Sequence, residues 1–486
     1  MLHRKTALTL SLLLLTSAAF AQFPGAKGVP DDYAKGFSSI TPEDSKELLT
    51  KLVSKDFGGR GSGQEGFAKA AKWYSQQLEK YGFQPAGTDG RWFQQVPLLK
   101  VGVRKETGLK LAGKPLDVTF GLATYQGQAD ASGDIVFLNL KSANAELDAS
   151  TMEGKIVVYR VATAGRRRFR SAAMPQALRN AKVAALIRVT GNAPITDRVG
   201  RVPQLTSKVP SVSVSVDDAN KLAACCALSD KFFSQAPERD TVVTAAADAK
   251  LTVDVVRETV DVPNVIGWYP GSDPELRHEH VGLGAHLDHL GMRGDAMYPG
   301  ADDNGSGSTA LLQIAKAIHT NPVKPKRSIF LIVFCGEELG LLGSRHYVEN
   351  ATRPLKDMVC MLNIDMIGRN EEKANEPASE NVDTIHLVGS KRISVELHEL
   401  TLKANQHIGF KFEYDEEGVY TRSDHANFAK KGIPITFIFG GFNPHYHKTT
   451  DTIEGINFNK IVSGARLNYL CAMMAAKHGH FEKNEE

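Results

Sequence analysis

The stretch VGLGAHLDH, residues 281–289, places five small or apolar residues directly before two histidines and an aspartate. Three more apolar runs of strand length, residues 328–335, 358–364 and 433–439, are likewise followed by histidines or carboxylates. Continuous apolar runs of this length are typical of strands in a parallel sheet that is buried on both faces. The pattern therefore predicts an α/β fold with a mixed, largely parallel central sheet flanked by helices.

Helical patterns precede and separate these strands. Thr41 is a cap residue, and it is followed by Pro42 and two acidic residues, which is the usual order at a helix start. Further helices are predicted from Gln64 to Tyr81 and over residues 306–319.

The texture changes between residues 105 and 252, where short strand-like runs follow one another without a cluster of histidines and carboxylates. We interpret this block as a smaller α/β domain inserted into the main one. The main domain would then be split into residues 38–104 and 253–486.

The N-terminus has the features of a secretory signal peptide. Residues 3–5 are basic, residues 8–15 are largely apolar, and Ala19 and Ala21 offer small side chains at the two positions that a signal peptidase reads. We predict a signal peptide over residues 1–21, cut after Ala21, and a secreted or periplasmic protein. The apolar run is too short for a comfortable membrane span, and no later segment is long enough, so no membrane span is expected.

Composition sets further bounds. The 486 residues carry a net charge of +3, or +1 without Arg4 and Lys5, which gives no reason to expect nucleic acid or an acidic membrane as a partner. The five cysteines form no CxxC pair. Cys335 and Cys360 lie in apolar runs and are predicted to be buried thiols, whereas the pairing of Cys225–Cys226 stays open.

Residues with metal-binding side chains follow each predicted strand. They are His286, Asp288 and His289 after the first, Glu337 and Glu338 after the second, Asp365 after the third, and His445 and His447 after the fourth. Open α/β sheets bind ligands at the carboxyl ends of their strands. Charged groups at that edge need partners or water. Histidines and carboxylates at the ends of all four strands therefore favour a metal site over simple packing.

A glycine-rich loop, residues 300–307, adds two acids at the start of the helix at Ser306. Asp302 and Asp303 would cap that helix if they had no other role. Together with the strand ends they give nitrogen and oxygen ligands without cysteine, which suits zinc. Two histidines and three carboxylates exceed the needs of one catalytic zinc, and they suit two ions about 3.5–4 Å apart with one bridging carboxylate.

Five segments together resemble the M28 family of zinc metallopeptidases: residues 285–289, 300–307, 334–344, 363–366 and 446–452. The resemblance extends over about residues 41–104 and from residue 253 to the C-terminal helix, and it implies the zinc-peptidase fold. The inserted block resembles a protease-associated (PA) domain, on its strand texture rather than on a motif.

The resemblance implies two zinc ions per chain and a set of residues that binds them. His286 and Asp365 would bind one ion, Glu338 and His447 would bind the other, and Asp303 would bridge them. His289 and His445 lie beside these ligands in the sequence and could exchange roles with them.

The resemblance also implies catalytic roles. Glu337 would be the general base, and Asp288 would hold His286 in the correct tautomer. Tyr446 aligns with a tyrosine that stabilises the oxyanion in some members. Ser423, Asp424 and His425 form another family-like segment, which we interpret as supporting rather than ligating.

The function predicted from these residues is that of a secreted two-zinc aminopeptidase, with peptides as substrates and an oligomeric state that stays open. A carboxypeptidase or dipeptidase of the same fold is one alternative, in which Arg422 would meet the substrate carboxylate. An acyltransferase of the glutaminyl cyclase type is less favoured, because those relatives use a single zinc. A non-catalytic binding protein is disfavoured by the presence of Glu337.

Overall fold

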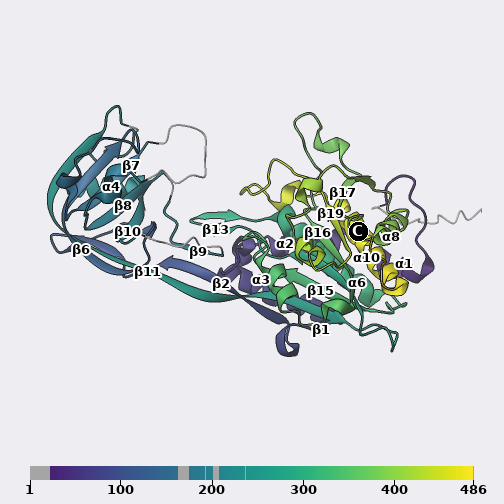
Figure 1. Ribbon diagram of the computed structural model, residues 1–486. Coiled ribbons are helices and arrows are strands. Elements are labelled where there is room, and N and C mark those ends of the chain that lie inside the picture. The colour runs from purple at the N-terminus through teal and green to yellow at the C-terminus, as the bar shows by residue number, and fades with distance from the viewer. Residues whose placement is uncertain (1–21, 163–173, 192, 201–206, 236, 485–486) are drawn as a thin grey trace, which may run out of the picture.

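The computed structural model describes residues 22–162, 174–191, 193–200, 207–235 and 237–484. The predicted signal peptide lies outside the described residues. Among the helices in these ranges, none has the length and apolar character needed to span a bilayer. Figure 1 shows a larger and a smaller lobe.

The larger lobe is built on a mixed sheet. In spatial order its strands are β1 (Gln84–Pro85), β11 (Thr241–Tyr269), β15 (Ser328–Phe334), β12 (His280–His286), β16 (Met358–Asp365), β19 (Ile435–Phe439), β17 (Thr384–Val388) and β18 (Lys411–Glu413). The four central strands, β15, β12, β16 and β19, are mutually parallel, whereas β11 runs antiparallel to β15 and β17 runs antiparallel to β19 but parallel to β18. The predicted mixed, largely parallel sheet is confirmed.

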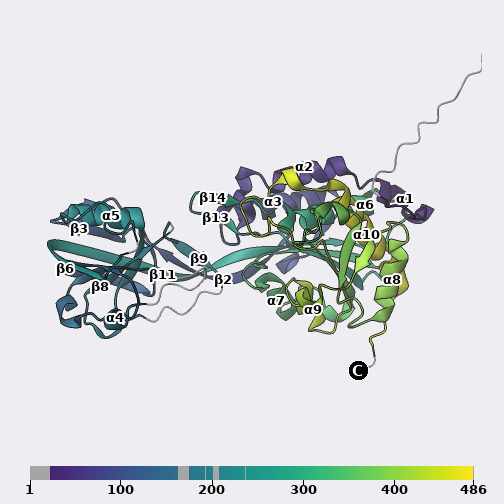
Figure 2. The same ribbon diagram turned by 90° about the horizontal axis from the view of Figure 1, so that it is seen from above.

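Helices cover both faces of this sheet (Figure 2). One face carries α1 (Asp31–Ser38), α2 (Pro42–Leu52), α3 (Glu65–Lys80), α6 (Gly307–Thr320) and α10 (Phe458–His478), with α8 (Val395–Asn405) packed against α10. The other face carries α7 (Leu342–Glu349) and α9 (His425–Ala429). In β15, Ile329 and Leu331 pack into the first layer, and Phe330 and Ile332 into the second. Each fully buried side chain of this kind stabilises the fold by about 1.5–3 kcal/mol, and burial on both faces explains the uninterrupted apolar run.

Local signals placed β12, β15, β16, β19, α3 and α6 within about two residues of their observed bounds. Thr41 caps α2, since its hydroxyl oxygen accepts a hydrogen bond from the Asp44 amide at 3.3 Å. The helices predicted from Gln64 and from Ser306 are α3 and α6. Cys335 and Cys360 are buried as predicted, and all five cysteines, each within the described ranges, are free thiols.

The smaller lobe has its own hydrophobic cores, formed by residues between Val101 and Val255. Its strands are β3 (Gly108–Leu111), β4 (Lys114–Leu116), β5 (Gly121–Leu122), β6 (Gly127–Leu140), β7 (Ile156–Val161), β8 (Ala185–Thr190) and β10 (Ser211–Ser215), with the helices α4 (Gln176–Asn180) and α5 (Val216–Cys225). β6, β7, β8 and β10 are parallel in that order. The identification of this lobe as a PA domain stays a prediction.

A two-stranded ribbon joins the lobes. β2 (Phe93–Val103) pairs antiparallel with the middle of β11, from Val103 opposite Val255 to Phe93 opposite Val265. The 29 residues of β11 continue from the smaller lobe into the larger one. The texture boundary near residue 253 therefore falls inside a strand rather than in a linker.

A short strand of the smaller lobe also reaches the larger one. β9 (Asp197–Val199) pairs with β2, and Val199 packs against Gly63 at the edge of the main core. Gly200 lies against the side chain of Leu339, just after the Glu337–Glu338 pair. A small hairpin of β13 (Gly291–Arg293) and β14 (Ala296–Tyr298) completes the described strands.

Candidate metal centre

The predicted metal ligands converge at one edge of the main sheet. His286 ends β12 and Asp365 ends β16, while the Glu337–Glu338 pair follows β15 by three residues. His447 lies in the loop after β19. Because these four strands are parallel, their carboxyl ends meet at the same edge, and the loop at the start of α6 adds Asp303 there.

These side chains form two groups that share Asp303. His286 Nε2 lies 3.4 Å from Asp303 Oδ1 and 3.3 Å from Asp365 Oδ1. His447 Nε2 lies 3.1 Å from both Asp303 Oδ2 and Glu338 Oε2. Ligand atoms around a tetrahedral zinc ion, with bonds near 2.05 Å, are about 3.3 Å apart. The donor set and its spacing therefore fit two zinc ions, with one oxygen of Asp303 facing each.

The proposed ligands differ in their exposure to solvent. The side chain of His447 is 36% exposed, whereas those of His286, Asp303 and Glu338 are 1%, 5% and 5% exposed. The cluster is therefore closed on the sheet side and open on the side of His447.

The ring of His286 is oriented by the main chain. Its Nδ1 lies 2.9 Å from the carbonyl oxygen of Asp288 and 3.8 Å from the carboxylate of the same residue. A proton held on Nδ1 leaves Nε2 free to face Asp303 and Asp365. The carboxylate of Asp288 instead accepts hydrogen bonds from the Glu337 amide at 3.2 Å and the Ser62 hydroxyl at 3.1 Å, which fixes the turn that carries Glu337.

The two outer carboxylates are each held through their second oxygen. Asp365 Oδ2 accepts a hydrogen bond of 2.8 Å from the Ser423 hydroxyl. Glu338 Oε1 lies 2.7 Å from Nδ1 of the fully buried His289. The structure thus brings His289 to the cluster, whereas the Nδ1 of His445 lies 2.9 Å from the Thr450 hydroxyl and belongs to its own loop.

The pKa values of Glu337 and Asp303 are shifted in opposite directions. Burial, together with the carboxylates of Glu338 and Asp365, raises the pKa of Glu337 well above its usual range, although His286 opposes this. For Asp303, burial alone would raise the pKa, but the surrounding histidines hold it well below the usual value. The two carboxyl groups thus differ in proton affinity, and Glu337 binds a proton more readily than Asp303 does.

Tyr446 lies against the open side of the cluster. Its ring stacks on that of His447 at a centroid distance of 3.8 Å, and its hydroxyl accepts a hydrogen bond of 3.3 Å from Arg422. Burial and the carboxylates of Asp303 and Glu338 raise the pKa of Tyr446, so its phenol stays protonated and can donate a hydrogen bond.

Arg60 is a supporting residue that the sequence did not reveal. Its guanidinium is fully buried and donates to four main-chain carbonyl oxygens, those of Leu52, Leu287, Pro299 and Gly300. Burial lowers its pKa to about 10, so it stays charged at neutral pH. It ties the loop that follows β12 to the loop that carries Asp303. No local pattern could identify the acceptors at Leu287, Pro299 and Gly300, which lie more than two hundred residues away.

Asp451 performs a similar task for the acidic loop. Its carboxylate accepts hydrogen bonds from the amides of Asp302 and Asp303 and from the side chain of Arg369. Asp302 accepts from the amide of Gly368 at 2.6 Å, and burial beside Asp451 raises its pKa to about 7. Neither Asp302 nor Asp303 caps α6, so the capping role considered for these two residues is wrong.

A third histidine–carboxylate group lies apart from the cluster. His386 Nε2 is 3.2 Å from Glu371 and 3.5 Å from Glu413. The ammonium of Lys373 lies 3.0 Å from Glu371 and 3.2 Å from Asp415, so two of its carboxylates are already paired with a lysine. We interpret it as an ion-pair network.

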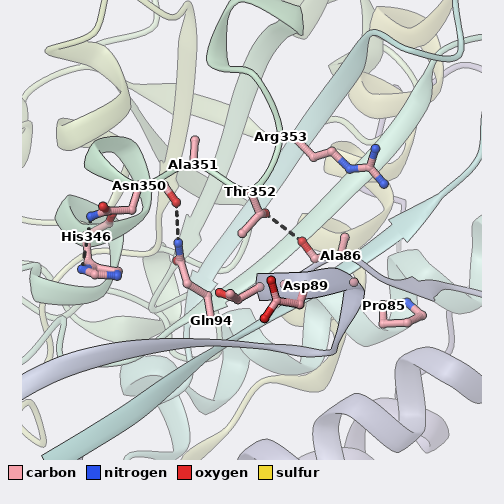
Figure 3. A pocket seen from close by; sticks show the side chains of 12 residues that line it. Pro85, Ala86, Asp89, Gln94, His346, Asn350, Ala351, Thr352 and Arg353 are labelled. Atoms are coloured by element: carbon pink, nitrogen blue, oxygen red, sulfur yellow. Dashed lines mark hydrogen bonds between the residues drawn. The ribbon is translucent and has the colours of Figure 1, made fainter.

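A surface pocket of about 480 Å³ lies elsewhere, between the turn after β1 and the segment after α7 (Figure 3). Two of its polar side chains are already bonded across it. Gln94 donates to the carbonyl of Asn350 and Thr352 to that of Ala86, each at 2.7 Å. None of the cluster residues lines this pocket, and it adds nothing to the metal centre.

Curated aminopeptidases are similar to part of this chain. A probable leucine aminopeptidase of Trichophyton verrucosum is 30% identical over 224 residues, which are 44% of this chain and 58% of that protein. Aminopeptidase YwaD of Bacillus subtilis is 35% identical over 170 residues, 34% of this chain and 35% of that protein. The chain thus spans about half the length, or less, of the curated relatives it matches.

Solved structures share the fold. A zinc aminopeptidase from Bacillus subtilis superposes with a TM-score of 0.54 at 20% identity, over 92% of this chain and 98% of that one. An aminopeptidase from an Aneurinibacillus strain gives 0.51 at 20% identity, over 94% and 98%. The model of peptidase family M28 matches residues 264–470. The part of the chain that holds the whole metal cluster is therefore the part that matches peptidase family M28.

Proposed function

We propose that this protein is a two-zinc aminopeptidase that removes N-terminal residues from peptides, exported as a secreted or periplasmic enzyme. The observation that carries the proposal is the pair of ligand groups that share Asp303, at spacings suited to two ions. The names of the relatives, leucine aminopeptidase and aminopeptidase, support the choice of substrate end.

Zinc ions bound by these residues would polarise the scissile carbonyl and lower the pKa of the attacking water. Glu337 would take a proton from that water and pass it to the leaving amine. The protonated phenol of Tyr446 would donate a hydrogen bond to the carbonyl oxygen as negative charge develops there. No side chain of the cluster would form a covalent bond to the substrate.

A carboxypeptidase is the second candidate, because the exposed Arg422 lies beside Tyr446 and could bind a substrate carboxylate. Three peptides of one sequence separate the two functions: one with free ends, one N-acetylated, and one C-amidated. We expect N-acetylation to abolish cleavage and C-amidation to leave it, as followed by mass spectrometry. The reverse pattern would establish the carboxypeptidase.

Metal dependence is tested with the same peptides. Removal of metal by a chelator should abolish hydrolysis, and added zinc should restore it as occupancy rises to two ions per chain. Full activity with one zinc per chain, measured by elemental analysis, would exclude the proposed two-ion centre.

A further inference from the structure

His447 differs from the other proposed ligands in how it is held. His286 and Asp365 are the last residues of strands, whereas His447 lies in the loop after β19 and is 36% exposed. Its φ of 56° lies in the left-handed region, which is uncommon for a residue other than glycine. A strained residue keeps such a conformation only where its surroundings fix it, so this loop needs firm anchors.

The two ends of this loop are fastened to the same pair of acidic residues. Before His447, the side-chain amide of Asn443 donates a hydrogen bond of 3.0 Å to Asp302 Oδ2. After it, the carboxylate of Asp451 accepts hydrogen bonds of 3.1–3.2 Å from the amides of Asp302 and Asp303. The loop that carries His447 is therefore anchored beside the carboxylate that would bridge the two ions.

Asn443 also organises its own part of the loop. Its Oδ1 accepts a hydrogen bond of 3.0 Å from the amide of His445, and its main-chain carbonyl accepts one of 3.2 Å from the amide of Tyr446. Together with the bond to Asp302, these contacts set the path of the chain directly before His447.

The acceptor of the Asn443 bond is itself held in place. Asp302 is 1% exposed, and its other oxygen, Oδ1, accepts hydrogen bonds from the amides of Gly368 at 2.6 Å and Arg369 at 3.2 Å, in the loop after β16. The Asp302 carboxylate thus joins the loop after β16 to the loop of His447. Its Oδ2 therefore has a fixed position for the Asn443 amide.

We propose that Asn443 is a positioning residue whose hydrogen bond to Asp302 holds the loop of His447 in place for zinc binding. This inference rests on the proposed two-zinc function. Partners that orient metal ligands typically contribute 10–100-fold to metal affinity. Loss of this bond should therefore weaken the zinc ion bound by His447 by about that factor and leave the other ion unchanged.

The test is a zinc titration of the metal-free protein against a chromophoric chelator. We expect two tight sites in the parent, and one tight and one weakened site in Asn443→Ala. Adding Asn443→Ala to His447→Ala should weaken zinc binding no further, because the bond acts through His447. Thr450→Ala is the matched control, since it removes the 2.9 Å contact with His445 inside the same loop and should keep both tight sites.

An exchange of the two partners tests the hydrogen bond itself. Asn443→Asp places a carboxylate against that of Asp302, and Asp302→Asn turns an amide group towards that of Asn443, so each single variant should weaken the same site. The double variant Asp302→Asn/Asn443→Asp again pairs one donor with one acceptor, and it keeps an oxygen for the amides of Gly368 and Arg369. We expect it to recover most of the lost zinc affinity.

Two tight sites in Asn443→Ala would overturn the inference, and so would a double variant that binds zinc as weakly as the two single variants. Equal weakening in Thr450→Ala would also contradict it, since any disturbance of the loop would then suffice. Thermal unfolding of the metal-free proteins checks that each variant keeps the fold. Fewer than two sites in the parent would instead refute the two-zinc function, which the blocked-peptide assay tests separately.

Discussion

At the scale of single residues, two adjacent glutamates have different environments. Glu338 lies within 3.1 Å of His447 and 2.7 Å of His289, so its carboxylate is fully engaged. The Glu337 carboxylate lies 4.0 Å from Nε2 of His286, and burial raises its pKa. One side chain is suited to hold metal and the other to move protons.

We therefore expect Glu337→Gln to keep both zinc ions and to lose about 10²–10⁴-fold in kcat, because glutamine cannot accept the proton. Hydrolysis of an aminoacyl anilide gives kcat, and elemental analysis gives the metal content. A variant that turns over at nearly the parental rate would show that the base has been assigned to the wrong residue.

The sequence predicts those residues of the site that a local pattern marks, and it does not predict those whose partners are distant in the chain. His286, Glu338 and Asp365 could be found because each lies at the end of an apolar run or a few residues after it, which is a local signal. Ser423 and Arg60 act through hydrogen bonds to residues that are distant in the chain, and no local pattern indicates these partners. His289 was noticed beside His286, but only the folded geometry gives its contact with Glu338.

At the scale of elements, β12 joins a stable core to the metal edge. Its last residue is His286, while its first, His280, is fully buried between the rings of Trp268 and Phe330. Burial lowers the pKa of His280 to about 4, with Arg353 lowering it further and Glu279 and a main-chain hydrogen bond opposing the shift. The ring is therefore neutral in the folded protein throughout the neutral and mildly acidic range.

This shift predicts acid sensitivity. Above pH 6.5, His280 is neutral in both the folded and the unfolded protein. Between pH 6.5 and about 4 only the unfolded chain binds the proton, so the stability of the fold decreases as the pH is lowered. The free energy of unfolding should fall by up to about 1.4 kcal/mol per pH unit over this window through His280 alone. Urea unfolding of the metal-free parent and of His280→Leu should show a shallower pH dependence in the variant. Identical slopes would contradict the assignment.

The elements also show why some of the fold escaped prediction. β15 and β16 are continuous apolar runs and were placed almost to the residue. β11 alternates exposed and buried residues in the smaller lobe and becomes largely buried near Val265, so its two halves have different textures. The change of composition near residue 253 therefore falls within one continuous strand, where β11 passes from the smaller lobe to the larger one.

At the scale of the whole molecule, the smaller lobe leaves and rejoins the larger one at neighbouring residues, because Val103 pairs with Val255. Every residue proposed for the metal centre lies outside the intervening segment. The domain limits themselves stay a prediction, and this pairing provides a way to test them.

Replacing residues 104–254 with Asn-Gly would join β2 and β11 by a two-residue hairpin. We expect the shortened protein to bind two zinc ions and to keep kcat on an aminoacyl anilide within about tenfold, since the cluster and its supporting residues are retained. A change confined to longer peptides would assign substrate selection to the smaller lobe. A folded product that binds no zinc would show that the centre depends on that lobe.

The ribbon of β2 and β11 has a mechanical consequence. It is paired from Val255 to Val265, about 35 Å of hydrogen-bonded strand, and β11 then continues beside β15. A twisted strand pair resists bending far more than a flexible linker does. The ribbon therefore restricts the movement of the smaller lobe relative to the sheet more than a linker would. A torque applied to that lobe is carried along β11 to the strand that ends just before Glu337 and Glu338.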